Sequence, residues 1–193
     1  MKEQMQKTNF YERLADLFEY PAADWKVATY ADLDPSDSFT SFLNGVDHIS
    51  LSELQELYTR TFDLNPVCAL EIGYHLFGEN YKRGEFLANL RQTEAPFDLG
   101  QDRQLPDYLP VLLRLIAKLQ DEELRSALIT KCLVPALEKM IKAVNGGENP
   151  YRYLLEVVHI RLRSELAFRS IETPAPPKPK RASLPIFQAG AMA

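Results

Sequence analysis

The segment Leu57–Arg83, LYTRTFDLNPVCALEIGYHLFGENYKR, constrains the fold strongly, because it joins two helical patterns at a proline. The residues that share the apolar face of the first pattern recur at i, i+4, i+7 and i+8: Leu54, Tyr58, Thr61 and Phe62. Asn65 precedes Pro66, and a residue in that position is sterically pushed out of the α region. The first helix is therefore predicted to end near Leu64.

A second helix is predicted after this corner. Pro66 suits the first turn of a helix, where its missing N–H leaves no hydrogen bond unmade. Leu70, Tyr74 and Phe77 follow at i, i+4 and i+7, and Gly78 is placed to end the helix. The sequence thus predicts a helix, a sharp corner at residues 63–66 and an aromatic-rich second helix.

Helical patterns also fill the rest of the chain to about residue 170. The expected helices lie at approximately 9–20, 23–30, 36–45, 50–64, 83–91, 105–119, 121–145 and 151–170. Helix starts are predicted at Thr8 or Asn9, at Ser36 or Asp37, at Asp121, and at Ser50, which forms the signature of a capping box with Glu53. Gly45 and Gly146-Gly147 are expected to end their helices, and Pro135 is expected to kink the helix that contains it. Residues 93–104 are predicted to form a loop.

Composition agrees with an all-α, single-domain helical bundle. The chain has 193 residues, of which 46% are hydrophobic, and only 8 glycines. The helical domain is expected over residues 1–172. Residues 173–193 contain five prolines and are expected to form a disordered, flexible tail. In an alternative interpretation, Leu184–Phe187 is an apolar plug that docks on a partner or on the domain itself.

Charge and cysteine content limit the classes of partner and the cellular compartment that we expect for this chain. The net charge is −5, and residues 1–170 alone carry −7, which disfavours nucleic acid and favours a basic peptide as partner. Cys68 and Cys132 lack metal-site or CxxC spacing, so two free thiols in a reducing cytoplasm are expected. The N-terminus lacks the apolar core of a signal peptide, and no run of residues reaches the length of a membrane span.

Catalytic and metal motifs are missing from the sequence. His48, His75 and His159 are scattered, no serine lies in a nucleophile elbow, and no phosphate-binding glycine loop is present. His75 has Glu71 and Glu79 at helical spacing, a pattern more typical of a solvated helix face than of a metal site. We therefore predict no catalytic residue, no bound metal and no cofactor.

Two blocks of sequence resemble a known family. FDLNP followed by YHLFG and the pair Arg83-Gly84 resembles the nitrate reductase assembly chaperones, the NarJ subgroup of the TorD/DmsD-like redox-enzyme maturation chaperones. Residues 105–110, LPDYLP, resemble the LPDHLP block of the same subgroup, with Tyr108 where that block has His. The resemblance extends over roughly residues 8–170.

The resemblance implies a system-specific chaperone rather than an enzyme. Its partner would be the immature catalytic (alpha) subunit of a respiratory nitrate reductase or related molybdenum oxidoreductase, bound through its N-terminal segment. The chaperone would keep that subunit competent for molybdenum-cofactor and iron–sulfur insertion before membrane attachment. It would approach the membrane only through the partner and act as a monomer or weak homodimer. The alternative is a structural or adaptor subunit that stays in the mature complex.

The residues expected to bind the partner peptide come from both blocks: Tyr58, Phe62, Asp63, Asn65, Pro66, Tyr74, His75, Phe77, Arg83, Asp107 and Tyr108. We expect helix-in-groove recognition, with aromatic side chains against the peptide and acidic side chains at the rim. Packing roles remain open for several of them. The aromatics have core spacing, Arg83 can pair with Glu79, and Asp107 suits the positive end of a helix.

Overall fold

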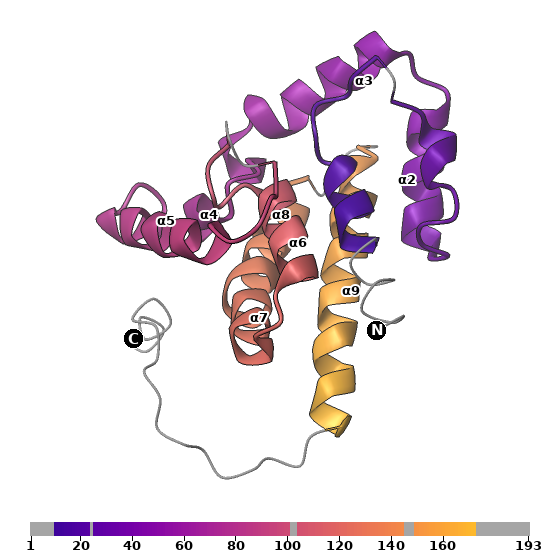
Figure 1. The fold of residues 1–193 in the computed structure, drawn as a ribbon. Helices are drawn as coiled ribbons and strands as arrows, with labels where there is room; N and C mark the ends of the chain where they lie inside the picture. Colours follow the sequence, from indigo (N-terminus) through magenta and orange to yellow (C-terminus); the bar gives the residue numbers. More distant parts are fainter. Residues whose placement is uncertain (1–9, 24, 101–103, 145–148, 173–193) are drawn as a thin grey trace, which may run out of the picture.

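The computed structural model describes residues 10–23, 25–100, 104–144 and 149–172, and these residues form an all-helical bundle (Figure 1). Residues 10–16 are helical, and the α-helices that follow are α2 (Asp37–Asp47), α3 (Leu51–Tyr58), α4 (Ile72–Phe77), α5 (Tyr81–Glu94), α6 (Leu109–Lys118), α7 (Glu122–Leu128), α8 (Val134–Val144) and α9 (Tyr151–Glu172). Short 3-10 helices lie at Val27–Tyr30 and Pro66–Cys68, and π-helical turns at Thr59–Asp63 and Ile129–Leu133. The all-α prediction is confirmed.

Helix α6 is the centre of the bundle. Its residues Leu109, Leu112, Leu113 and Ile116 are fully buried, and Val111 on its opposite side is buried as well. Arg114 and Lys118 form its one polar side, and so broad an apolar surface is stable only when other elements cover it. Helix α9 packs along both α2 and α8, and the helix at residues 10–16 lies beside it. Among the described residues, no helix combines the length and apolar character that a membrane crossing requires.

Aromatic side chains from distant parts of the chain meet at Tyr151, the first residue of α9. The Phe62 ring lies 4.9 Å from that of Tyr151, and the rings of Phe42 and Tyr58 lie 5.9 and 6.0 Å from it. All four side chains are buried. Edge-to-face pairs of this kind contribute about 0.5–1.5 kcal/mol each beyond their burial. This cluster holds α2, α3 and α9 together at one end of the bundle.

The helix starts predicted from capping residues are confirmed where the structure describes them. Ser36 accepts a hydrogen bond from the backbone N–H of Phe39 at the start of α2. Ser50 and Glu53 form the predicted capping box, with the Ser50 N–H donating to the Glu53 carboxylate at 2.7 Å. Asp121 caps α7 through two backbone N–H groups. The caps expected at Thr8 or Asn9 and the stop at Gly146-Gly147 lie outside the described residues.

Two predicted helix ends are wrong. The first helix ends at Asp16 rather than Tyr20, because residues 17–19 turn away with i→i−3 hydrogen bonds. Helix α2 continues through Gly45 to Asp47. Gly45 serves close packing instead of termination, since a Cβ there would lie 2.7 Å from the Cβ of Pro150.

The predicted continuous helix from Pro66 to Phe77 is also wrong. Pro66 does start a helical turn, but that turn ends at Cys68, and α4 begins only at Ile72. Glu71 is extended and pairs with Tyr108 in the segment before α6. The Ile72 N–H donates to the Asp107 carbonyl at 2.8 Å, and the Leu109 N–H donates to the Leu70 carbonyl at 2.9 Å. Gly78 ends α4 as predicted, with φ of 60°.

The same pairing delays the helix expected from Leu105. Residues 105–108 form a turn closed by the Tyr108 N–H and the Leu105 carbonyl, so α6 starts at Leu109. The kink expected at Pro135 stays a prediction; the structure has a π-helical turn at Ile129–Leu133, which ends two residues before this proline. A proline removes one i→i−4 hydrogen bond, and a wider turn absorbs that loss.

Candidate functional site

The two sequence blocks lie against each other in space, joined by an antiparallel bridge between Glu71 and Tyr108. This pairing brings the residues that precede α4 to the residues that precede α6. Buried backbone N–H and C=O groups outside helices need hydrogen-bond partners, and here the two blocks supply them to each other. The spacing between the blocks in the sequence therefore reflects a structural junction, with the site built around it.

Asp107 is the buried anchor of this junction. Its Oδ2 atom accepts hydrogen bonds from the Gly73 N–H and from Arg83 Nε, both at 3.1 Å. Arg83 Nη2 lies 3.0 Å from the same oxygen. Burial raises the pKa of the Asp107 carboxyl, and the Arg83 guanidinium opposes that rise. Arg83 thus pairs with Asp107, and the pairing with Glu79 expected from helical spacing is wrong.

Gly73 is required where Asp107 approaches α4. A Cβ at this position would lie 2.6 Å from Asp107 Oδ2 and 3.0 Å from the Phe86 ring. Tyr74, the next residue, is half-buried, and the Arg83 guanidinium lies over its ring at 5.9 Å from the centroid. Phe77 is half-buried against Phe86, with ring centroids 5.4 Å apart. These residues tie α4 to α5 and to the 105–109 segment.

A pair of tyrosine hydroxyls links the corner to the N-terminal segment. The hydroxyls of Tyr58 and Tyr108 lie 3.0 Å apart, and both reach the Phe18 carbonyl, at 3.0 and 3.3 Å. Burial raises the pKa of both phenols, so they act here as neutral hydrogen-bonding groups. Tyr58, Phe62 and Tyr108 are all buried in this structure.

His75 is half-buried and bound to backbone. Its Nε2 atom lies 2.6 Å from the Ala69 carbonyl, and Lys139 Nζ donates to the His75 carbonyl at 2.5 Å. Desolvation lowers the pKa of this imidazole, and Lys139 acts in the same direction. Burial likewise raises the pKa of the Cys68 thiol to about 12. In the part of the chain that the structure describes, no cluster of three or more His, Cys, Asp or Glu side chains is arranged to hold a metal.

The exposed part of the site is the corner itself. Asp63 and Pro66 are exposed and Asn65 is half-exposed; the Asn65 carbonyl accepts from the Cys68 N–H at 2.9 Å. The Asp63 side chain forms no hydrogen bond or ion pair with another described residue. Two apolar neighbours are unusually open to solvent, Leu64 at 75% and Val67 at 60%.

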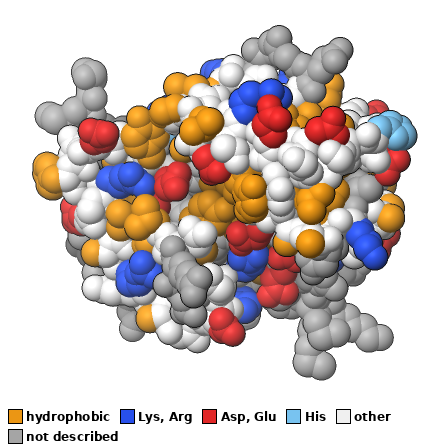
Figure 2. Space-filling view, turned by 90° about the horizontal axis from the view of Figure 1, so that it is seen from above, with side chains coloured by type: hydrophobic (Ala, Val, Ile, Leu, Met, Phe, Trp, Pro, Cys, Tyr) orange, Lys and Arg blue, Asp and Glu red, His pale blue; other side chains and the backbone are white. Residues whose placement is uncertain are grey.

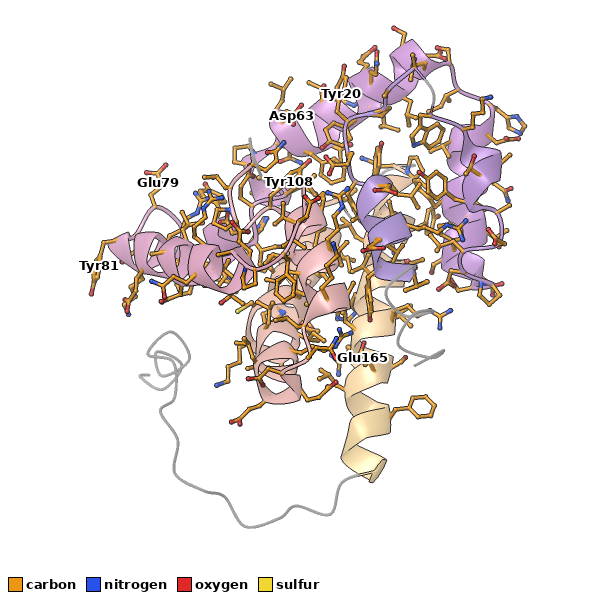
Figure 3. All side chains as sticks on the ribbon, in the orientation of Figure 1. Tyr20, Asp63, Glu79, Tyr81, Tyr108 and Glu165 are labelled. Carbon is orange, nitrogen blue, oxygen red and sulfur yellow. The ribbon has the colours of Figure 1, made fainter. Side chains whose placement is uncertain are left out.

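Tyr20 and Leu105 extend this exposed apolar area. Tyr20 is 52% exposed and sits edge-on against Tyr58, with centroids 5.5 Å apart, and Leu105 is 45% exposed in the turn that leads to Tyr108. We call Tyr20, Leu64, Val67 and Leu105 the corner surface. Figure 2, which views the molecule from above, shows hydrophobic side chains across the middle of this face, with acidic and basic side chains around them. Figure 3 shows Tyr20, Asp63 and Tyr108 at this end of the molecule.

Sequence reasoning missed all four residues of the corner surface. The sequence did offer a signal for two of them. Leu64 and Leu105 are apolar residues within two residues of a proline, where the chain is expected to turn. The predicted site residues instead divide into three sets. Tyr58, Phe62 and Tyr108 lie in the core, and Asp63, Asn65 and Pro66 form the corner. The remaining residues lie at or beside the junction: Tyr74, Phe77, Arg83 and Asp107, together with His75, which is bound to the Ala69 carbonyl.

An open cleft with an acidic lining includes Glu19, the residue before Tyr20 of the corner surface. Its volume is about 480 Å³, and its walls are formed by Glu12, Glu19, Asp98, Leu99, Gly100 and Arg114. Arg114 lies 2.8 Å from Glu19 and 2.9 Å from Asp16, while Lys118 lies 3.8 Å from Glu12. Four carboxylates thus face two cations, so the cleft and its edge keep negative charge.

Comparison with known proteins places these features in a family. A family model described as nitrate reductase delta subunit matches residues 30–145. The probable nitrate reductase molybdenum cofactor assembly chaperone NarJ of Bacillus subtilis (strain 168) is 24% identical over 172 residues, which cover 84% of this chain and 92% of that protein. The assembly chaperone NarJ of Escherichia coli (strain K12) is 27% identical over 154 residues, covering 74% of this chain and 64% of that protein.

A further relative in Escherichia coli (strain K12) is the probable assembly chaperone NarW, 27% identical over 133 residues, covering 68% of this chain and 57% of that protein. The family model spans both sequence blocks, the corner and the junction around Asp107. Because it matches more than half of the chain, this protein belongs to the nitrate reductase delta subunit family.

Proposed function

We propose that this protein is a chaperone for the immature catalytic subunit of a molybdenum oxidoreductase, with nitrate reductase as the first candidate. The names of its relatives support the role, since they are nitrate reductase molybdenum cofactor assembly chaperones. It binds the N-terminal segment of that subunit and keeps the subunit competent for molybdenum-cofactor and iron–sulfur insertion before membrane attachment. It performs no catalysis itself.

The corner surface is the observation that carries this proposal. Four large apolar side chains are exposed on segments that lead to two buried tyrosines. Tyr20 packs on Tyr58, Leu64 and Val67 follow the helical segment that contains Tyr58, and Leu105 lies in the turn that ends at Tyr108. Exposed apolar areas that are rimmed by polar residues mark interaction sites. An amphipathic peptide helix lays its apolar face on these side chains, and Asp63 at the edge attracts its basic residues.

The buried site residues position this surface. The Tyr58–Tyr108 hydroxyl pair holds the backbone at Phe18, two residues before Tyr20. The Asp107–Arg83 pair fixes the segment that contains Leu105 against α4 and α5. Preorganised contact residues lower the ordering cost of binding. We therefore assign Tyr58, Asp107 and Tyr108 to positioning and the corner surface to peptide contact.

Calorimetric titration with a synthetic peptide tests the proposal. The peptide is the N-terminal segment of the nitrate reductase catalytic subunit encoded with this chain, titrated at low and high salt. We expect binding that weakens with salt and has a negative heat-capacity change. Leu64→Ser combined with Val67→Ser should weaken binding by roughly tenfold or more, because each side chain loses about 1–2 kcal/mol of apolar burial.

Tyr81→Ser is the matched control, because Tyr81 is 81% exposed on α5, away from the corner surface in Figure 3. It should leave the peptide affinity unchanged. Asp63→Asn should reduce mainly the salt dependence, since it removes one exposed charge and little area. If the peptide binds the Leu64→Ser, Val67→Ser variant as tightly as the wild-type chain, the corner surface is not its binding site.

The description of the family as a delta subunit favours one alternative, an adaptor that stays in the mature oxidoreductase complex. Purification of the assembled enzyme separates the two roles. A chaperone is lost during assembly, whereas an adaptor co-purifies in fixed proportion to the catalytic subunit. The same preparation reports whether this chain reaches the membrane only together with its partner.

We further infer the setting in which the chaperone works. Its free, buried thiols Cys68 and Cys132 suit a reducing cytoplasm. Its acidic balance suits a basic peptide rather than nucleic acid. A monomer or weak homodimer, with a helical domain over residues 1–172 and a separate segment 173–193, remains our proposal for its organisation.

A further inference from the structure

We propose that residues 178–187 of this chain dock on its own corner surface and acidic cleft, where they compete with the partner peptide. The inference rests on the proposed function for its consequence, because docking regulates access to the same site. Residues 173–193 lie outside the described residues, so the argument uses their sequence and the surface that the described residues form.

The C-terminal sequence has the composition that the surface requires. Lys178, Lys180 and Arg181 are its only charged residues after Glu172, so residues 173–193 carry +3. Since the whole chain carries −5, residues 1–172 carry −8. Leu184, Ile186 and Phe187 follow the basic residues within six positions. The partner peptide proposed above likewise combines apolar residues with basic residues.

The surface presents matching features in the matching order. Glu12, Asp16 and Glu19 recur at i, i+4 and i+7 along the segment that starts with the helix at residues 10–16. Tyr20, the first residue of the corner surface, follows directly. Figure 1 shows this N-terminal helix beside α9. A segment that leaves α9 and returns along the N-terminal helix meets the acidic residues first and the apolar residues second.

The distances allow this path for the basic residues. The Tyr11 hydroxyl donates to Glu165 at 2.9 Å, so Glu12 lies near the level of Glu165 on α9. From Glu165 to Glu172 the helix spans roughly 10 Å. Lys178 and Arg181 follow Glu172 by six and nine residues, which is about 19 and 28 Å at the 3.1 Å per residue of a proline-rich segment.

The apolar residues also have the reach they need. Tyr20 packs on Tyr58 and Tyr58 packs on Tyr151, with centroids 5.5 and 6.0 Å apart, so Tyr20 lies near the first residue of α9. The length of α9 from Tyr151 to Glu172 is about 32 Å. Leu184 and Phe187 follow Glu172 by 12 and 15 residues, or about 37 and 46 Å. The apolar cluster therefore reaches the corner surface while the basic cluster lies at the acidic cleft.

Because the segment belongs to the same chain as the surface, even weak binding gives a high occupancy. A segment joined by a short linker faces its site at an effective concentration of about millimolar. If the free segment binds with a dissociation constant of about 100 μM, the tethered segment occupies the site roughly nine-tenths of the time. The partner peptide then binds about tenfold more weakly than to an open site, and it displaces the segment when its own affinity is higher.

The first experiment uses the full chain and a synthetic peptide of residues 173–193 as the probe. The tail-apolar variant carries Leu184→Ser, Ile186→Ser and Phe187→Ser, which open the site without truncating the chain. Calorimetry should show the probe binding the tail-apolar variant at least fivefold more tightly than the wild-type chain. Met192→Ser, outside the docking segment, is the control and should match the wild type.

The surface side of the contact is tested with the same probe. Adding Leu64→Ser and Val67→Ser to the tail-apolar variant should abolish probe binding. Adding Glu12→Gln and Asp98→Asn to the tail-apolar variant instead should reduce the salt dependence of probe binding. Equal probe affinity for the wild-type and tail-apolar chains, or no probe binding to either, would overturn the docking proposal.

A titration with the partner peptide distinguishes this proposal from the proposed function. We expect the partner peptide to bind the tail-apolar variant about fivefold to tenfold more tightly than the wild type. Equal partner affinity for both chains overturns the inference and leaves the chaperone function standing. If the partner peptide binds neither chain while the probe still discriminates between them, the docking contact holds and the proposed partner is wrong.

Discussion

At the scale of single residues, Gly73 decides whether the junction around Asp107 can close. Its N–H donates to Asp107 Oδ2, and a Cβ would lie 2.6 Å from that same oxygen. We predict that Gly73→Ala lowers the free energy of unfolding by about 1–3 kcal/mol, the usual cost of overpacking a tight site. Urea denaturation followed by circular dichroism measures the change.

Gly84 supplies the matched control in the next helix. It lies within α5, and a Cβ there would have no neighbour within 4 Å. Gly84→Ala should therefore raise the free energy of unfolding by about 0.5–1 kcal/mol, through helix propensity alone. If Gly73→Ala is as stable as Gly84→Ala, the Asp107 side chain can move aside to accept the added Cβ.

At the scale of elements, α3 matters because it carries Tyr58 and leads into the corner. Its first turn is held by the Ser50 hydroxyl, which accepts from the Glu53 N–H at 3.3 Å, and by the Glu53 carboxylate. Ser50→Ala should cost about 1 kcal/mol in the free energy of unfolding, the typical value for a lost N-cap. Thermal denaturation compared with Ser52→Ala measures it.

Ser52 is the exposed second residue of the same helix and does not serve as its cap. Alanine has the higher helix propensity, so Ser52→Ala should be neutral or stabilise by a few tenths of a kcal/mol. Similar melting temperatures for the two variants would mean that packing alone holds α3 and that the capping box adds nothing.

At the scale of the whole molecule, one buried ion pair joins three segments that are far apart in the sequence. Arg125 on α7 makes two hydrogen bonds of 2.8 Å to Glu165 on α9, which also accepts from the Tyr11 hydroxyl. The side chains of Arg125 and Glu165 are only 3% and 8% exposed. Arg125→Ala should destabilise the fold by about 3–5 kcal/mol, because it leaves a buried carboxylate without its cation.

Two comparisons check that interpretation by equilibrium denaturation. Arg125→Met with Glu165→Leu should recover most of the lost stability, since paired apolar side chains remove the buried charge altogether. Arg163→Ala removes an exposed partner of Glu138 and should change stability by less than about 1 kcal/mol. A double variant as unstable as Arg125→Ala would assign the loss to packing instead of to charge.

The sequence alone determined the properties that depend on neighbours along the chain. Helix periodicity predicted the all-α class and the buried face of α6, while Ser36, Ser50 and Asp121 marked helix starts, because a cap bonds within three residues of itself. Asn65-Pro66 likewise predicted the corner. The resemblance of the two blocks to a chaperone family needed no structure, since it depends on the order of the residues.

Tertiary structure decided everything that depends on residues distant in the sequence. The helix expected after Pro66 is broken because Leu70 and Ile72 bond to the backbone at Leu109 and Asp107. Arg83 pairs with Asp107 rather than with Glu79 for the same reason. Burial is a property of the packed bundle, so periodicity left both a core role and a groove role open for Tyr58 and Phe62, and the structure places both side chains in the core. Periodicity also missed Leu64 and Val67, which packing leaves exposed at the corner.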